Sequence, residues 1–175
     1  MESGPRLSEW PDPGHRLSDR ETDIIRRTWS RVCGDSEGLG VRVLIRFFSN
    51  SPAARQYFRQ FQHLQDPQEM QHCVQLRRHA RRVMGAISSL VENLEYPDEV
   101  DSILVSIGRA HALRHKVDPV YFKILNGVIL EILVEEYSEF FTHEAQKAWT
   151  KLMSLIYIKV SATYQEVGWV QNSSP

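Results

Sequence analysis

The sequence contains little cysteine, since Cys33 and Cys73 are the only two in 175 residues. Two cysteines cannot form the disulfide framework of a small secreted domain, and neither belongs to a Cys-x-x-Cys pair. We interpret both as reduced thiols, which is typical of a reducing compartment. We therefore expect a cytoplasmic protein.

The sequence also lacks an excess of positive charge and a long apolar run. Its 21 Lys and Arg balance 22 Asp and Glu, for a formal charge of −1. This balance excludes the excess of basic residues that is typical of a nucleic-acid-binding domain. The N-terminal residues contain no signal-like apolar stretch, and no run approaches the roughly 18 residues of a membrane span. The most apolar stretch, 127–134, is interrupted by Glu131. We expect no nucleic-acid partner and no membrane span.

Strand signals are absent as well. No segment alternates polar and apolar residues, and no turn dipeptide separates two such segments. The fold class expected is therefore all-α. With 42% hydrophobic residues the chain fits one domain with a sizeable core. We assign residues 1–17, with their prolines and glycines, to a flexible tail, residues 18–167 to the domain, and residues 168–175 to a short C-terminal tail.

Apolar spacing and capping residues predict six long helices and two short ones. Ser18 with Glu21 forms a capping box at the first helix, and Thr142 is the expected cap of the last. The long helices are predicted over about 18–33, 36–49, 74–93, 97–113, 119–137 and 142–167, and the short ones begin near Pro52 and Pro67.

Two histidines lie on apolar helix faces, and they are the main functional signal. His79 continues the apolar stripe of helix 74–93, and His111 continues that of helix 97–113. A cation shares a face with each, because Arg82 follows His79 by three residues and His115 follows His111 by four. If the two stripes face each other, both imidazoles point into one apolar slot with cations at its edge. Such a slot suits haem, an apolar disc with an iron at its centre and two propionates at its rim.

Other interpretations remain open at this point. A single histidine on an apolar face is most often a core residue, and Arg77, Arg78 and Arg81 fit a solvated basic face. His111 and His115 have the helical i, i+4 spacing of a zinc pair, although no nearby carboxylate completes a tetrahedral set.

Several strings resemble the globin family. Residues 75–83 and 108–116 resemble the distal and proximal helices of vertebrate globins, and Phe58 matches the phenylalanine that stacks on the haem. Pro52, Trp29 and Tyr164 match further family positions. Longer strings at 46–50, 56–58, 117–131 and 164–171 resemble the cytoglobin branch, and the short tail suggests a non-mammalian or duplicated form. The resemblance covers residues 18–171 and implies a globin fold of about eight helices around a pocket for haem b, iron protoporphyrin IX.

The resemblance also implies individual roles. His111 is the proximal iron ligand, oriented by the carbonyl of Ile107, and His79 is the distal histidine, a second iron ligand and the catalytic residue. The remaining pocket positions are Phe58 and Val83 as walls, Leu44 as an apolar lid, Arg82 and His115 as partners of the propionates, and Val117, whose backbone accepts the Tyr164 hydroxyl.

The function implied is a six-coordinate haem protein that reversibly binds oxygen, nitric oxide and carbon monoxide. We expect a nitric oxide dioxygenase, with nitrite reduction and peroxide chemistry as side activities. Turnover needs an external electron donor, because nothing resembles a flavin or nicotinamide domain. The alternative is a non-catalytic protein that stores, transfers or senses oxygen. The resemblance further implies a homodimer and a nuclear as well as cytoplasmic location.

One departure concerns the cysteines. Mammalian members of the cytoglobin branch carry a disulfide that tunes the distal histidine, and the matching positions here are Ser36 and Arg81. By resemblance, the second and distal helices cross at Gly40 and Ala80. Helix geometry then places the Cα atoms of Cys33 and Cys73 roughly 15 Å apart, beyond the limit of about 7 Å for a disulfide. We predict no bond between them.

Overall fold

A computed structural model describes residues 16–60 and 63–169, and over these residues the chain forms helices and no strand. The α-helices are α1 (Asp19–Val32), α2 (Ser36–Asn50), α3 (Pro67–Gln71), α4 (Val74–Glu92), α5 (Pro97–Arg109), α6 (Val120–Glu136) and α7 (His143–Glu166). Three shorter helical segments are η3 (Cys33–Asp35), η4 (Pro52–Tyr57) and η5 (Ala110–His115). The all-α class is confirmed, as are six long helices with short ones at Pro52 and Pro67. The tail predictions at 1–15 and 170–175 lie outside the described residues.

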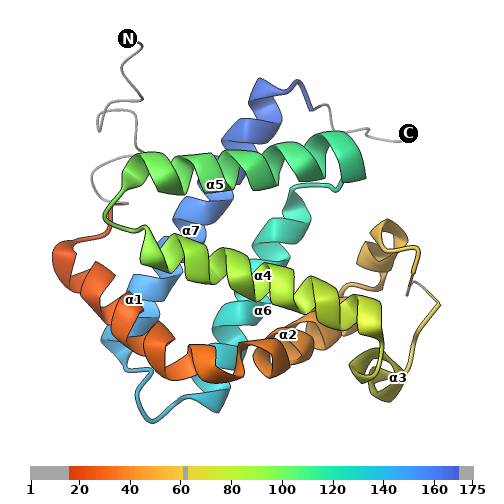
Figure 1. Ribbon diagram of the computed structural model, residues 1–175, viewed down its shortest axis with the longest axis horizontal. Coiled ribbons are helices and arrows are strands. Elements are labelled where there is room, and N and C mark those ends of the chain that lie inside the picture. The colour runs from red at the N-terminus through yellow and green to blue at the C-terminus, as the bar shows by residue number, and fades with distance from the viewer. Residues whose placement is uncertain (1–15, 61–62, 170–175) are drawn as a thin grey trace.

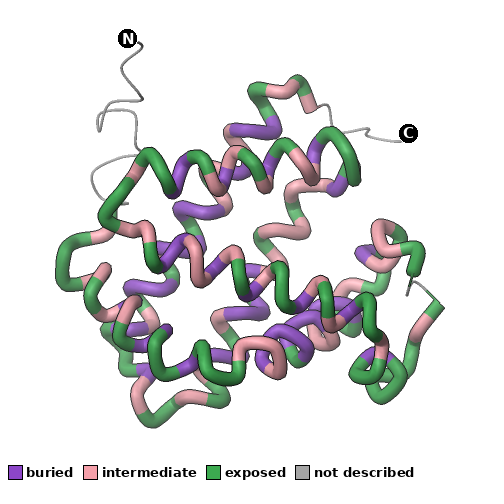
Figure 2. The backbone as a smooth tube through the Cα atoms, viewed as in Figure 1, coloured by how far each residue is buried: buried purple, intermediate pink, exposed green. Residues whose placement is uncertain are grey.

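The long helices cross one another in layers (Figure 1). α2 packs against α4 and α6, while α7 packs against α1, α5 and α6. Buried positions recur along each long helix, as Figure 2 shows, and they join in one hydrophobic core. No helix within the described residues combines the length and apolar character needed to cross a bilayer.

The α2 and α4 helices cross closely at Gly40. A Cβ atom at Gly40 would lie 2.9 Å from Cγ of Met84 and 3.0 Å from Cβ of Ala80. These distances are shorter than ordinary van der Waals contacts, so the crossing needs the small residue at position 40. The crossing predicted at Gly40 and Ala80 is confirmed, and it fixes the part of α4 that carries His79.

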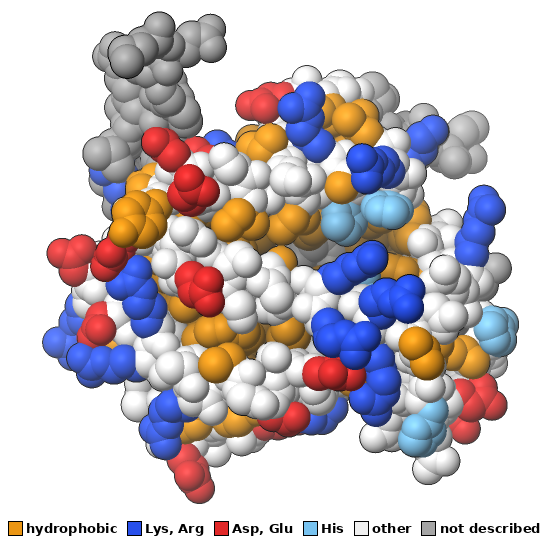
Figure 3. Space-filling view, in the orientation of Figure 1, with side chains coloured by type: hydrophobic (Ala, Val, Ile, Leu, Met, Phe, Trp, Pro, Cys, Tyr) orange, Lys and Arg blue, Asp and Glu red, His pale blue; other side chains and the backbone are white. Residues whose placement is uncertain are grey.

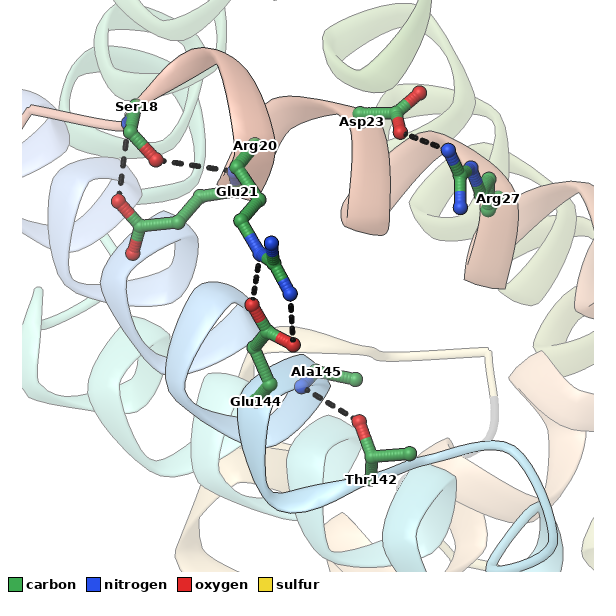
Figure 4. A network of polar contacts seen from close by, with 8 residues as sticks. All are labelled: Ser18, Arg20, Glu21, Asp23, Arg27, Thr142, Glu144 and Ala145. Carbon is green, nitrogen blue, oxygen red and sulfur yellow. Dashed lines mark hydrogen bonds and ion pairs between the residues drawn. The ribbon is translucent and has the colours of Figure 1, made fainter.

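The first and last helices are joined at their N-terminal ends (Figure 4). Ser18 accepts a hydrogen bond from the Glu21 backbone at 3.1 Å and donates its own N–H to the Glu21 side chain at 3.0 Å, which confirms the capping box. Thr142 caps α7 by accepting from Ala145 N–H at 3.1 Å. Arg20 pairs with Glu144 through two guanidinium nitrogens. This pair is exposed, and so it contributes little stability.

The end of α5 differs from the prediction. We expected a regular helix as far as Leu113, but α5 ends at Arg109 and continues as the wider π-helical segment η5. Lys116 then adopts a left-handed conformation with φ of 52°, and Val117 N–H donates to the His111 carbonyl at 3.0 Å. The Tyr164 hydroxyl donates to the Val117 carbonyl at 2.6 Å. The hydrogen bond from Tyr164 of α7 thus anchors the chain directly after the widened segment.

Candidate functional site

His111 lies at the start of η5 with a defined tautomer. Its Nδ1 lies 2.8 Å from the carbonyl oxygen of Ile107, as expected from the resemblance. A carbonyl oxygen can only accept, so Nδ1 carries the hydrogen. Burial lowers the pKa of the His111 ring despite the opposing effect of this hydrogen bond. The ring is therefore neutral, and Nε2 has a free lone pair, the form that binds a metal.

His79 lies on α4, where its ring contacts Phe58 edge to face at a centroid distance of 4.8 Å. Burial lowers the pKa of His79 to about 4, with smaller contributions from His111, Arg82 and His115. Within the described residues, no hydrogen bond is found to its ring nitrogens. The His79 ring is thus neutral at physiological pH and retains an unused lone pair.

The two histidines interact electrostatically, because His111 is one of the groups that lower the pKa of His79. Among the described residues, no group of three or more His, Cys, Asp or Glu side chains is arranged to bind a metal. His111 and His115 form a ring contact at 5.6 Å without a third ligand, so the zinc interpretation gains no support. Two neutral imidazoles instead suit a metal that brings its other ligands with it, as the iron of a porphyrin does.

Positive side chains gather over the N-terminal half of α4, on the side of the molecule where α5 ends, beside histidine and apolar side chains (Figure 3). The arginines of α4 separate into two groups here. Arg77 and Arg81 pair with Glu37 of α2 at 3.4 and 3.2 Å. Arg82 is exposed and has no ion pair within residues 16–60 and 63–169. It is therefore available to an anionic group of a ligand.

The remaining predicted positions fall into two groups. Phe58 contacts the His79 ring, and Val117 donates its N–H to the His111 carbonyl, so these two residues lie beside the histidines. Val83 is partly buried one turn after His79, and Leu44 is fully buried in the core on α2. No described contact joins Leu44 or Val83 to either histidine, and their roles in the pocket stay predictions.

Sequence reasoning missed Phe122, whose ring contacts His111 at 5.0 Å. It lies in the first turn of α6, a helix that is apolar on most of its sides. Periodicity therefore could not distinguish this position from its neighbours. The one local signal for Phe122 was the helix start at Asp118-Pro119. That start determines which residues form the first turn, and Phe122 is one of them.

Cys33 and Cys73 are both free. The Cys33 thiol lies 3.6 Å from the Ser30 carbonyl, and the Cys73 thiol lies 3.4 Å from the Gln75 side chain. Each thiol thus donates to a group within three residues of it, which agrees with the prediction of no bond between the two cysteines.

Comparison with known proteins identifies the family. A family model described as Globin matches residues 41–160. Cytoglobin-2 of Oryzias latipes is 55% identical over 164 residues, which are 94% of this chain and 92% of that protein. Cytoglobin-2 of Danio rerio is 55% identical over 166 residues, 95% of this chain and 91% of that protein. Cytoglobin-1 of Danio rerio is 47% identical over 169 residues, 96% of this chain and 95% of that protein. The chain belongs to the globin family as a cytoglobin-type, haem-binding globin that binds small gases such as oxygen.

Proposed function

We propose that this globin holds haem b with its iron between His111 and His79, and that it acts as a nitric oxide dioxygenase. The observation that carries the proposal is the pair of neutral imidazoles on α4 and η5, near enough for His111 to lower the pKa of His79. His111 has its Nδ1 hydrogen bonded to Ile107, so its Nε2 carries the lone pair that would bind the iron. His79 has no such second partner among the described residues, so its ring is free to bind the iron and to leave it.

The side chains around the histidines suit the rest of the cofactor. Arg82 and His115, both exposed, are the proposed partners of the propionates. Phe58, Val83, Leu44 and Val117 supply the apolar surroundings that the porphyrin needs.

When bound, haem supplies an iron that binds oxygen and supports the oxidation of nitric oxide to nitrate. The contribution of this chain comes mainly from His79. A neutral imidazole carries one N–H and one lone pair, so the same ring can serve as an iron ligand or donate a hydrogen bond to a polar gas molecule. The apolar side chains, Phe58 among them, exclude water and so limit unwanted proton transfer to a gas molecule in the pocket. Electrons must come from an external donor.

Two variants test the ligand assignment. His111→Ala should lose haem during purification, because the imidazole that the Ile107 carbonyl orients is removed. His79→Ala should keep haem and change from a low-spin six-coordinate to a five-coordinate ferrous absorption spectrum. Loss of haem from His79→Ala together with retention of haem by His111→Ala would contradict the assignment.

The reaction itself is tested by nitric oxide consumption with oxygen and a cytosolic reductant. We expect catalytic turnover that is faster than that of a simple storage globin and that His79→Ala alters. Turnover no faster than that of a storage globin would favour oxygen storage, transfer or sensing instead.

A further inference from the structure

A row of aromatic rings leads from His111 to the end of α7. The Phe122 ring lies 5.0 Å from that of His111, the Tyr164 ring lies 6.2 Å from that of Phe122, and the Trp169 ring lies 5.2 Å from that of Tyr164. Each pair is in edge-to-face contact. His111 is at the haem site, whereas Trp169 is partly exposed. The row therefore connects the interior of the site with the protein surface through packed rings.

The rings differ in how easily they lose an electron. Phenylalanine and neutral imidazole are hard to oxidise, which leaves Tyr164 and Trp169. A phenol must release its proton when it is oxidised, but the Tyr164 hydroxyl donates to the Val117 carbonyl, which is no base. Burial also raises the pKa of Tyr164, so its proton is held firmly.

Trp169 is free of this restriction. An indole can lose an electron and keep its N–H as a cation radical. The Trp169 Nε1 is buried and has no hydrogen-bond partner in the described part of the chain, so no acceptor pulls the proton away. An oxidising equivalent that enters the row is therefore most stable at its outer end.

We propose that Trp169 is the electron donor of this protein toward hydrogen peroxide, connected to the haem site through Phe122 and Tyr164. Reduction of one hydrogen peroxide breaks its O–O bond and consumes two electrons and two protons to give two waters. One electron leaves the Trp169 indole, and the other enters at the haem from a one-electron donor such as ascorbate. A second molecule of the same donor then restores the indole. The inference rests on the proposed haem binding at His111.

When no external donor is present, we expect oxidation of the Trp169 side chain itself. Trp169 then loses two electrons and takes up one oxygen atom, so that indole and hydrogen peroxide give oxygenated indole and water. Trp149 and Trp29 are deeply buried and lie in a separate aromatic cluster, so they should stay intact and serve as internal controls.

The experiment uses haem-loaded full-length protein, with loading checked by the Soret band before one equivalent of hydrogen peroxide is added. Peptide mass spectrometry should find the mass of one added oxygen on Trp169 and not on Trp149. Ascorbate should prevent the addition. Freeze-quenched electron paramagnetic resonance should give an indole radical signal that narrows with ring-deuterated tryptophan and disappears in Trp169→Phe.

Two controls separate this pathway from direct attack on an exposed side chain. Haem-free protein with the same peroxide should leave Trp169 unmodified. Phe122→Leu interrupts the row without touching Trp169 and should lower the oxidation of Trp169 several-fold per bound haem, with the haem content read from the Soret band of the variant. Equal oxidation in the haem-free protein or in Phe122→Leu, or a radical on tyrosine, would overturn the proposal. If no Soret band forms, the haem site itself fails, which is a different and visible result.

Discussion

At His79, burial and the neighbouring positive groups act in the same direction. They lower the pKa from 6.5 to about 4 in the folded, haem-free protein. The unfolded chain therefore binds more protons between these pH values. The stability that a neutral His79 contributes is complete above pH 6.5 and is lost as the pH falls toward 4.

This linkage predicts that the haem-free protein loses up to about 3 kcal/mol of unfolding free energy over that pH range through His79. Urea unfolding at several pH values measures the slope. His79→Leu should flatten it, because the titrating group is gone, whereas His143→Gln, a change at an exposed histidine, should leave it unchanged. An equally steep slope in His79→Leu would show that other groups cause it.

Arg82 and Arg78 are both exposed arginines on α4, yet only Arg82 contributes to the low pKa of His79. Arg82→Gln should therefore raise the rate of haem loss by up to about fivefold, the range of an exposed ion pair. Arg78→Gln is the matched control and should not change it. Transfer of haem to an excess of an acceptor globin measures both rates, and equal rates in the two variants would exclude a propionate contact at Arg82.

At the scale of the elements, the α2–α4 crossing determines where His79 lies. Gly40→Ala places a methyl group 2.9 Å from Met84 and 3.0 Å from Ala80. We expect a loss of about 1–3 kcal/mol from this overpacking. Gly85→Ala on α4 meets nothing within 4 Å and should stabilise the helix by about 0.5–1 kcal/mol. Urea unfolding distinguishes the two variants. An unchanged free energy of unfolding in Gly40→Ala would mean that the two helices can move apart without cost.

The elements also indicate what can be predicted from sequence alone. Caps at Ser18 and Thr142 act through neighbouring backbone groups, so local sequence was sufficient to place those helix starts. The widened helix after Arg109 was not predicted, because the chain that follows it is anchored by Tyr164, a residue far away in sequence that local patterns do not reveal. Phe122 was missed for a related reason, since its role depends on how α6 packs beside η5.

At the scale of the whole molecule, the candidate site joins distant parts of the chain. Phe58 follows η4, His79 lies on α4, His111 begins η5 and Phe122 lies on α6. A ligand bound among them favours the folded state by mass action. Haem loading should therefore stabilise the protein by about 4 kcal/mol when free haem is about 1,000 times its dissociation constant. Unfolding midpoints of the two forms measure this gain, and equal midpoints would mean that haem does not bind preferentially to the folded protein.

The central claim is that both His79 and His111 bind the iron. The absorption spectrum of the purified, reduced protein without added gas tests it most directly. We predict a low-spin six-coordinate haem spectrum. A five-coordinate ferrous spectrum would contradict binding by His79, and protein that stays colourless after hemin is added would contradict the site as a whole.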